Sequence, residues 1–182
     1  MVKKVFRMRR GGGYWIWKPI LIQHVLKNMS YGDVLVYADA GCTMLKKPRV
    51  INTEIEKVKK NKFGISHCDA EGGPRKDLIR MDVLSALVSD IDAYFSREYE
   101  FEANRLVICK TTNSVKFINK WASIAFKHPR WFTDDPSKIP NLPEFYEHRH
   151  DQAIYNCIAH EMKMPIIDCS VEKWLIATRY RN

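Results

Sequence analysis

Apolar positions along the chain alternate between helical spacing and short continuous runs. Residues 19–29 place apolar side chains at the three- and four-residue intervals of one helix face, and Pro19 suits the first turn of that helix. The segment 34–37 is apolar throughout, which predicts an interior strand covered on both faces. This strand ends in the small and acidic segment 38–41, so a helix and a strand open the predicted fold.

The rest of the chain continues the alternation of helices and strands. We expect helices at 54–60, 78–88, 113–125 and 151–158, and short strands at 63–67, 105–110 and 166–167. Asn113 or Ser114 suits the N-cap of the third of these helices and Asp151 that of the fourth. Between them, 128–143 is predicted to be an ordered surface loop. The pattern predicts an α/β fold, with a largely parallel sheet flanked by helices, in one domain spanning 1–182.

The composition is that of a folded domain with a net positive charge. The chain has 182 residues, of which 46% are apolar and 28% charged, and this excludes a disordered or low-complexity protein. Its 30 Lys and Arg exceed 21 Asp and Glu, which gives a formal net charge of +9. The surface should therefore favour anions: nucleic acid, a membrane face or a phosphorylated small molecule.

Cysteine usage and the N-terminal segment predict a cytoplasmic location. The five cysteines are odd in number, widely spread and without a CxxC pair, which fits a reducing compartment. The first ten residues are strongly basic, but no apolar stretch follows that would form a signal peptide or a membrane helix. We expect no transmembrane segment, although the basic surface allows peripheral contact with a membrane.

Asp39 stands at the predicted end of the first strand. Open α/β sheets bind ligands beyond the carboxyl ends of their strands. The small residues Ala40 and Gly41 let a ligand approach the backbone, and a carboxylate there suits a divalent cation that bridges nucleotide phosphates. The alternative is that Asp39 only caps the next turn.

The block Glu147–Gln152 concentrates reactive side chains at a predicted loop-to-helix junction. Arg149 offers bidentate phosphate recognition, His148 and His150 offer metal ligation or proton transfer, and Asp151 offers a general base or an acceptor for a sugar hydroxyl. The alternative is a solvated helix start.

A third block, 11–19, is rich in glycine and aromatic residues but lacks the known phosphate-loop patterns. Its aromatic residues fit a core equally well, while its Lys18 stands where it can reach a diphosphate.

Read in order, three blocks resemble a family of GT-A-fold glycosyltransferases of bacterial and viral polysaccharide pathways. They are G-G-G-Y-W-I-W-K-P at 11–19, G-D-V-L-V-Y-A-D-A-G-C at 32–42 and F-Y-E-H-R-H-D-Q at 145–152. The resemblance implies a GT-A-like, Rossmann-like, mostly parallel sheet and a nucleotide-sugar donor, with UDP- or GDP-linked donors favoured. It also implies a glycan acceptor, Mn²⁺ or Mg²⁺ at Asp39, and Asp151 as the catalytic residue. The donor-binding residues it implies are Trp17, Lys18, Asp39, Ala40, Gly41, Arg149, His150 and Gln152.

Two departures from that family keep other functions open. Members begin with a strand and helix before the first block, where this chain has about ten residues, and Gly41 replaces the second Asp of the usual Asp-x-Asp metal motif. An inactive, truncated transferase is therefore one alternative. A basic nucleic-acid-binding module is another, although nucleic acid is not expected as an obligate partner, and a metal-dependent hydrolase using His148, His150 and Asp151 is a third.

Overall fold

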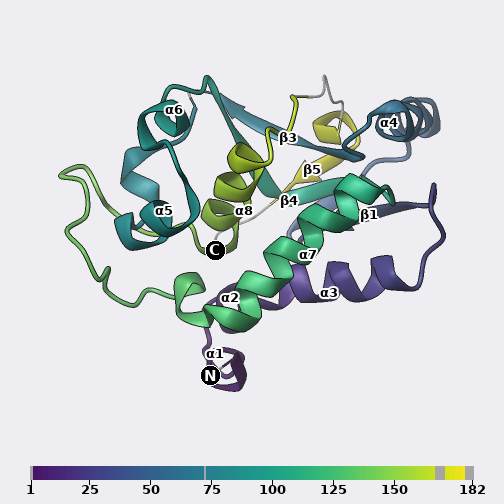
Figure 1. Cartoon of the computed structure of the whole chain (residues 1–182). Helices are drawn as coiled ribbons and strands as arrows, with labels where there is room; N and C mark the ends of the chain where they lie inside the picture. Colours follow the sequence, from purple (N-terminus) through teal and green to yellow (C-terminus); the bar gives the residue numbers. More distant parts are fainter. Residues whose placement is uncertain (1, 72, 167–170, 179–182) are drawn as a thin grey trace.

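A three-stranded antiparallel sheet in the order β1-β4-β3 forms the centre of the computed structural model, which describes residues 2–71, 73–166 and 171–178 (Figure 1). The strands are β1 (Val34–Ala38), β4 (Tyr99–Cys109) and β3 (Ile65–Glu71). Val34 lies opposite Cys109, and Ile65 lies opposite Ile108. Because both outer strands run against the long β4, the fold is mixed α/β with an antiparallel sheet.

The predicted parallel sheet is therefore wrong, and so is the interior position of the first strand. Among the described residues β1 pairs only with β4 and forms an edge of the sheet. The prediction of cover on both faces is confirmed, since Leu35 and Tyr37 pack into one apolar cluster while Val34 and Val36 pack into another. Cover on both faces produces a continuous apolar run whichever way the neighbouring strand points, so the run does not encode strand direction.

Three helices cover one face of the sheet: α3 (Trp17–Lys27), α7 (Thr112–Lys127) and α8 (His150–Glu161) (Figure 1). They enclose the largest apolar cluster, in which Trp121 and Tyr155 are fully buried. The N-cap of α7 is Thr111 rather than the predicted Asn113 or Ser114. Ser114 instead completes a capping box, in which Thr111 and Ser114 each bond the other's backbone N–H.

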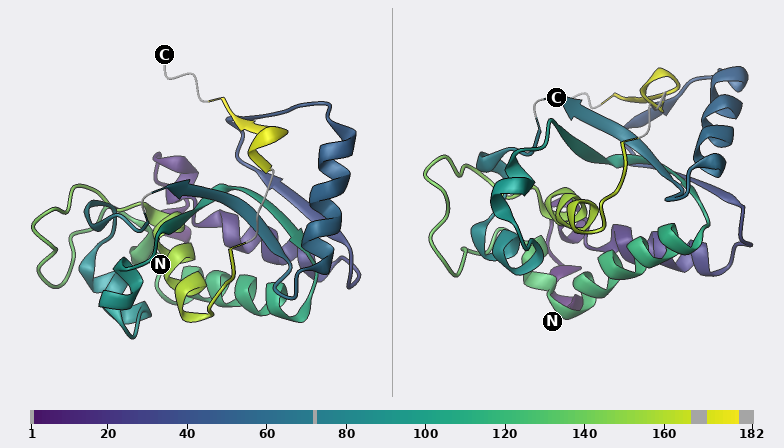
Figure 2. Two further views of the ribbon diagram at one scale, coloured as in Figure 1. Left: turned by 90° about the horizontal axis from the view of Figure 1, so that it is seen from above. Right: turned by 45° about the horizontal axis from the view of Figure 1, so that its top comes forward.

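The other face carries a smaller layer (Figure 2). It consists of α4 (Pro48–Lys60), the 3₁₀ turn η3 (Val171–Lys173) and a two-stranded antiparallel sheet of β2 (Cys42–Met44) and β5 (Leu175–Ala177). The helix predicted at 54–60 begins earlier, with Pro48 in its first turn. The strand predicted at 166–167 lies partly outside the described residues, and Ile166 is not in a strand.

A third cluster packs Ile79, which follows η1 (Lys76–Leu78), together with α5 (Met81–Leu87) and α6 (Ile91–Phe95) against α8. The single helix predicted at 78–88 is thus divided, because Arg80 has an extended backbone between η1 and α5. The predicted loop at 128–143 begins with the 3₁₀ turn η2 (Pro129–Phe132) and continues without helix or strand. Phe132 at its start is fully buried and anchors this end of the loop to the core.

The N-terminal segment contains α1 (Val2–Val5) and then α2 (Gly11–Tyr14), which is a left-handed helical turn. Gly11, Gly12, Gly13, Tyr14 and Trp15 all have φ between 55° and 99°. Tyr14 N–H donates to Arg10 O at 2.6 Å and Trp15 N–H to Gly11 O at 3.3 Å, which closes the turn. Among the described residues, no helix is both long enough and apolar enough to cross a membrane.

Candidate active site

A cavity of about 340 Å³ lies where β1 ends and where α3 and α8 begin. Its wall includes Lys18 from α3, Asp39 after β1, Glu100 from β4 and Asp151 from α8. These elements are far apart in the sequence and meet where β1 ends beside the central strand β4. The cavity therefore depends on the tertiary fold and not on any single motif.

Lys18 is the centre of this site. Its Nζ lies 2.6 Å from Asp151 Oδ2 and 3.3 Å from Asp39 Oδ1, and its side chain is 3% exposed. The same Nζ donates to the carbonyl oxygen of Ala103 at 3.1 Å. A cation in the first turn of a helix is opposed by the helix dipole. The two carboxylates compensate this cost and leave the three-residue cluster with a formal charge of −1.

Tyr37 fixes the carboxylate of Asp39 from the β1 side. Its hydroxyl donates to Asp39 Oδ1 at 2.7 Å, and the Lys18 ammonium lies 5.5 Å from its ring centroid. Burial, reinforced by the neighbouring Asp39 carboxylate, raises the pKa of Tyr37 well above its usual value, so this phenol stays protonated and remains a donor.

Asp151 lies inside the first turn of α8, so its predicted role as N-cap is wrong. Arg149 holds the cap position, and its side chain makes no capping hydrogen bond. The Asp151 carboxylate instead points to Lys18. Burial raises the pKa of Asp151, against the opposing effect of the Lys18 ammonium. Asp151 is therefore an acidic group held in place by an ion pair.

His150 combines backbone strain with unmet hydrogen-bonding capacity. Its φ is 47°, a conformation that L residues rarely adopt, and its side chain is buried. Neither ring nitrogen has a hydrogen-bond partner among the described residues, although Nε2 lies 3.6 Å from Asp134 Oδ1. Burial lowers the pKa of His150 to about 4, so the imidazole is neutral near pH 7. An imidazole in this position on the cavity wall can hydrogen-bond to a ligand or to water.

The left-handed turn supports His150 through aromatic contacts. The Trp15 ring stacks on the imidazole with centroids 5.6 Å apart, and the Tyr14 ring approaches it edge-on at 5.1 Å. A left-handed helical residue costs about 1–2 kcal/mol unless it is glycine, and Gly11–Gly13 make three of the five such residues inexpensive. The glycine block thus positions an aromatic platform at the cavity.

Cations lie at the mouth of the cavity. Arg149, Arg75 and Arg10 line it and are exposed, and Arg149 Nε contacts Glu147 Oε1 at 3.1 Å. Exposed ion pairs of this kind contribute little stability and exchange readily for other anions. Lys18 and Arg149 were predicted to flank the same cleft as Asp39, and the structure brings all three to one cavity.

Glu100 is a site residue that the sequence analysis missed. It is 5% exposed and lines the same cavity from β4. Burial raises its pKa to about 7, despite the opposing charges of Arg97, Arg149 and Arg75. A carboxyl that titrates near neutrality can both accept and donate a proton. The available signal was the alternation of Glu100, Glu102 and Asn104 with apolar residues over 99–104, which is typical of a strand with one polar face.

The remaining predicted site residues separate into two groups. Gln152 lines the cavity, whereas Trp17, Ala40 and Gly41 are not among the described residues that do so. Trp17 donates its indole N–H to Gly11 O at 3.0 Å and so stabilises the left-handed turn. His148 is buried behind the cavity, with Nε2 2.8 Å from Trp131 O, and burial lowers its pKa to about 3.

The protein does not by itself supply a shell of metal ligands here. No three His, Cys, Asp or Glu residues in the described part of the chain are arranged to hold a metal ion. Asp39 Oδ1 already accepts from Tyr37 and contacts Lys18. A divalent cation at Asp39 fits only if phosphate oxygens and water provide most of its ligands, as they commonly do for Mg²⁺.

No protein-family model, curated protein or solved structure matches this chain. The likeness to glycosyltransferases therefore rests on the three sequence blocks described above. What the structure adds is the position of those blocks relative to one another.

Proposed function

We propose that this protein transfers a sugar from a nucleotide-sugar donor to an acceptor hydroxyl. One observation carries the proposal: the three sequence blocks meet in a single buried cluster. Lys18 of the first block contacts Asp39 of the second and Asp151 of the third. The contacts join the blocks through their charged residues, which suits a shared chemical role better than separate roles in packing.

The donor diphosphate is proposed to bind at the arginines of the cavity mouth. Arg149 and Arg75 would exchange their partly exposed partners, Glu147 and Asp77, for phosphate oxygens, which accept bidentate hydrogen bonds from guanidinium groups. Trp15 offers an aromatic face within the same cavity. UDP- and GDP-linked donors are the first to test, with Mn²⁺ or Mg²⁺ at Asp39 as an added positive charge on the diphosphate.

Side chains of the cavity can then orient the sugar and accept the proton of the acceptor hydroxyl. Asp151 and the neutral imidazole of His150 line the cavity and offer hydrogen bonds to sugar hydroxyls. If the reaction inverts the anomeric centre, a carboxylate must take the acceptor proton; Asp151 and Glu100 both stand in the cavity with raised pKa values. If it retains the centre, Asp151 instead orients the donor sugar.

A second candidate function is binding to nucleic acid, and exposed cations at the two ends of α4 favour it. The exposed cations on α4 and the segments beside it are Lys46, Lys47, Arg49, Lys59, Lys60 and Lys62. Binding through these residues would fall steeply as salt concentration rises, because each phosphate contact releases a counterion.

A thermal-shift panel tests the proposed function. The folded protein is melted with UDP-, GDP-, CMP- and dTDP-sugars, each with and without Mn²⁺. A donor present at about 100 times its Kd should stabilise the fold by about 2.7 kcal/mol. Arg149→Met should weaken this effect, whereas Arg7→Met, which changes an exposed arginine that does not line the cavity, should not. If no nucleotide sugar raises the melting temperature, the proposed donor class is wrong.

A further inference from the structure

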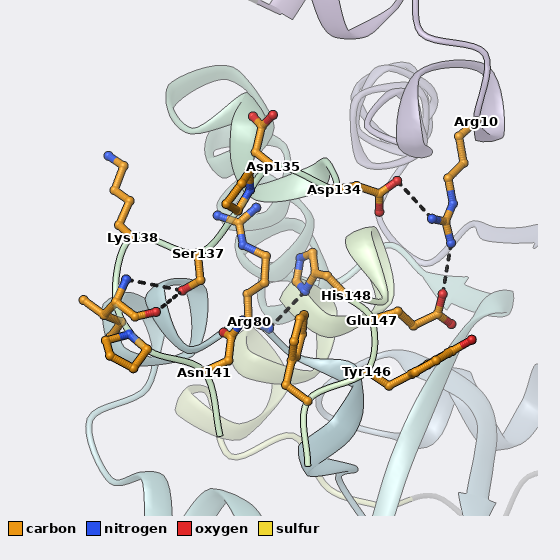
Figure 3. Close-up of a pocket in the computed structure, with 14 residues that line it drawn as sticks. Arg10, Arg80, Asp134, Asp135, Ser137, Lys138, Asn141, Tyr146, Glu147 and His148 are labelled. Atoms are coloured by element: carbon orange, nitrogen blue, oxygen red, sulfur yellow. Dashed lines mark hydrogen bonds and ion pairs between the residues drawn. The ribbon is translucent and has the colours of Figure 1, made fainter. Parts of the chain in front are cut away.

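A second, larger cavity lies beside the first (Figure 3). Its volume is about 710 Å³, within the roughly 300–1,000 Å³ range of small-molecule sites. It is bounded by 134–141, by 145–148, and by Arg10 and Arg80. Arg10 and Glu147 line both cavities, so the two compartments share a wall.

Arg10 forms this wall by connecting two loops. Its guanidinium contacts Asp134 Oδ2 at 2.9 Å and Glu147 Oε2 at 3.1 Å, and its side chain is 45% exposed. Figure 3 shows Arg10 reaching between these two carboxylates. Exposed ion pairs are weak, so the separation of the two cavities depends on contacts that a ligand can replace.

Arg80 forms the floor of the second cavity and is held by more contacts than the exposed Arg10. Arg80, which is 3% exposed, makes a bidentate ion pair with Asp82 at 3.0 and 2.7 Å. Its Nη1 donates to the carbonyl oxygens of Arg130 and Thr133, at 3.2 and 3.3 Å. His148 accepts from Arg80 N–H at 3.4 Å and contacts Trp131 O at 2.8 Å, which fixes 145–148 onto η2. A preformed floor lowers the entropy cost of binding.

The lining is polar and balanced in charge. Arg10, Arg80 and Lys138 stand against Asp134, Asp135 and Glu147, so there is no excess of cations that would select a phosphate. Ser137 and Asn141 add a hydroxyl and an amide. Such a lining suits a neutral ligand with many hydroxyl groups, because carboxylates and guanidinium groups give charge-assisted hydrogen bonds to hydroxyls.

Tyr146 adds an exposed aromatic ring to this lining, whose apolar part also includes Pro136, Ile139 and Pro140. It is 82% exposed, the largest value among the exposed large apolar and aromatic residues of the described chain. A pyranose ring has one face of C–H groups, and an aromatic ring that is rigid and carries a hydroxyl can contact that face while bonding to the rim. The adjacent Phe145 lines the cavity as well and is half-buried.

We propose that the second cavity binds a neutral oligosaccharide, the acceptor, with one sugar ring against Tyr146 and hydroxyls on Asp134 and Glu147. The inference rests on the proposed function, since an acceptor is needed only by a transferase. It places the acceptor beyond Arg10, on the far side of the wall from the donor. Transfer then requires the acceptor's reactive end to pass Arg10 into the first cavity.

Saturation-transfer NMR on the whole chain tests this proposal. The probes are the trisaccharides of glucose, galactose, mannose and N-acetylglucosamine, each titrated without nucleotide. We expect saturable binding of at least one probe, and Tyr146→Ala should weaken it about tenfold or more, as loss of an aromatic residue that carries binding energy does. Tyr31→Ala is the matched control, because Tyr31 is 67% exposed and does not line this cavity.

The outcomes separate this proposal from the donor proposal. Binding of a trisaccharide that persists when a nucleotide sugar occupies the first cavity supports two compartments. Absence of binding by all four probes, or binding unaffected by Tyr146→Ala, overturns the acceptor site even if nucleotide sugars bind. Trisaccharide binding by a chain that no nucleotide sugar stabilises supports the second cavity as a carbohydrate site and contradicts the transferase.

Discussion

The Lys18 ammonium and the Asp151 carboxylate lie 2.6 Å apart in the buried junction of α3 and α8. Removing two charges from water costs several kcal/mol per ion, so a buried ion pair is seldom more stabilising than apolar side chains of the same size. Here a second carboxylate, Asp39, adds further negative charge. Stability alone does not account for this cluster, which is why we interpret it as a functional site.

Lys18→Met should destabilise the fold strongly. The change leaves Asp39 and Asp151 buried without their shared cation, and loss of one partner from a buried pair costs about 3–5 kcal/mol. Urea denaturation measures the free energy of unfolding. Lys27→Met, at an exposed position of the same helix, should change it by less than about 0.5 kcal/mol. Equal stability of the two variants would show that the cluster is not held by Lys18.

Gly13→Ala should be more destabilising than Gly32→Ala. Both glycines have left-handed backbones, with φ of 99° and 91°, so both substitutions carry a strain of about 1 kcal/mol or more. A Cβ at Gly13 would also lie 2.8 Å from Val5 O, whereas a Cβ at Gly32 would meet nothing within 4 Å. Thermal unfolding compares the two. Equal losses of stability would mean that Gly13 does not lie against the backbone of Val5 and Phe6.

Glu100→Gln should change how stability depends on pH. The folded carboxyl has a pKa of about 7, raised by burial from 4.5, so the folded state binds more protons than the unfolded state between these values. Glu100 therefore lowers stability progressively as pH rises from about 4.5 to about 7. Glutamine does not titrate, so the stability of wild type relative to the variant should fall across this window.

The measurement is urea denaturation of both proteins at several pH values. His148 and His150 have lowered pKa values of about 3 and 4, and they decrease stability as pH falls. Their contributions are common to wild type and variant and cancel in the difference. A difference that stays constant with pH would show that Glu100 titrates in its ordinary range.

Much of the site could be predicted from the sequence because its residues fall in compact blocks. Lys18, Asp39 and Arg149 were each chosen for their chemistry next to an expected helix or strand end, and the structure places them at one cavity. Their partners could not be predicted. The ion pair of Lys18 with Asp151 depends on how α3 and α8 pack, which no local pattern records.

The direction and extent of the strands were the weakest predictions. The strand β4 covers Tyr99–Cys109, yet only 105–110 was expected, since Glu100, Glu102 and Asn104 interrupt the apolar pattern. Those polar residues lie where β4 passes the cavity. Because β4 was expected to be short, neither its pairing with both neighbours nor the role of Glu100 was foreseen.

Turnover of the nucleotide sugar by Asp151→Asn tests the central claim most directly. Lys18 keeps Asp39 as its partner in this variant, so the protein should fold and still be stabilised by the donor. The measured quantity is the rate at which the nucleoside diphosphate is released in the presence of acceptor, monitored by chromatography. This rate should fall roughly 10²-fold or more, as expected when a positioned acid or base is removed. A folded Asp151→Asn protein that turns over its donor at the wild-type rate would contradict the assignment of this cluster as the reaction centre.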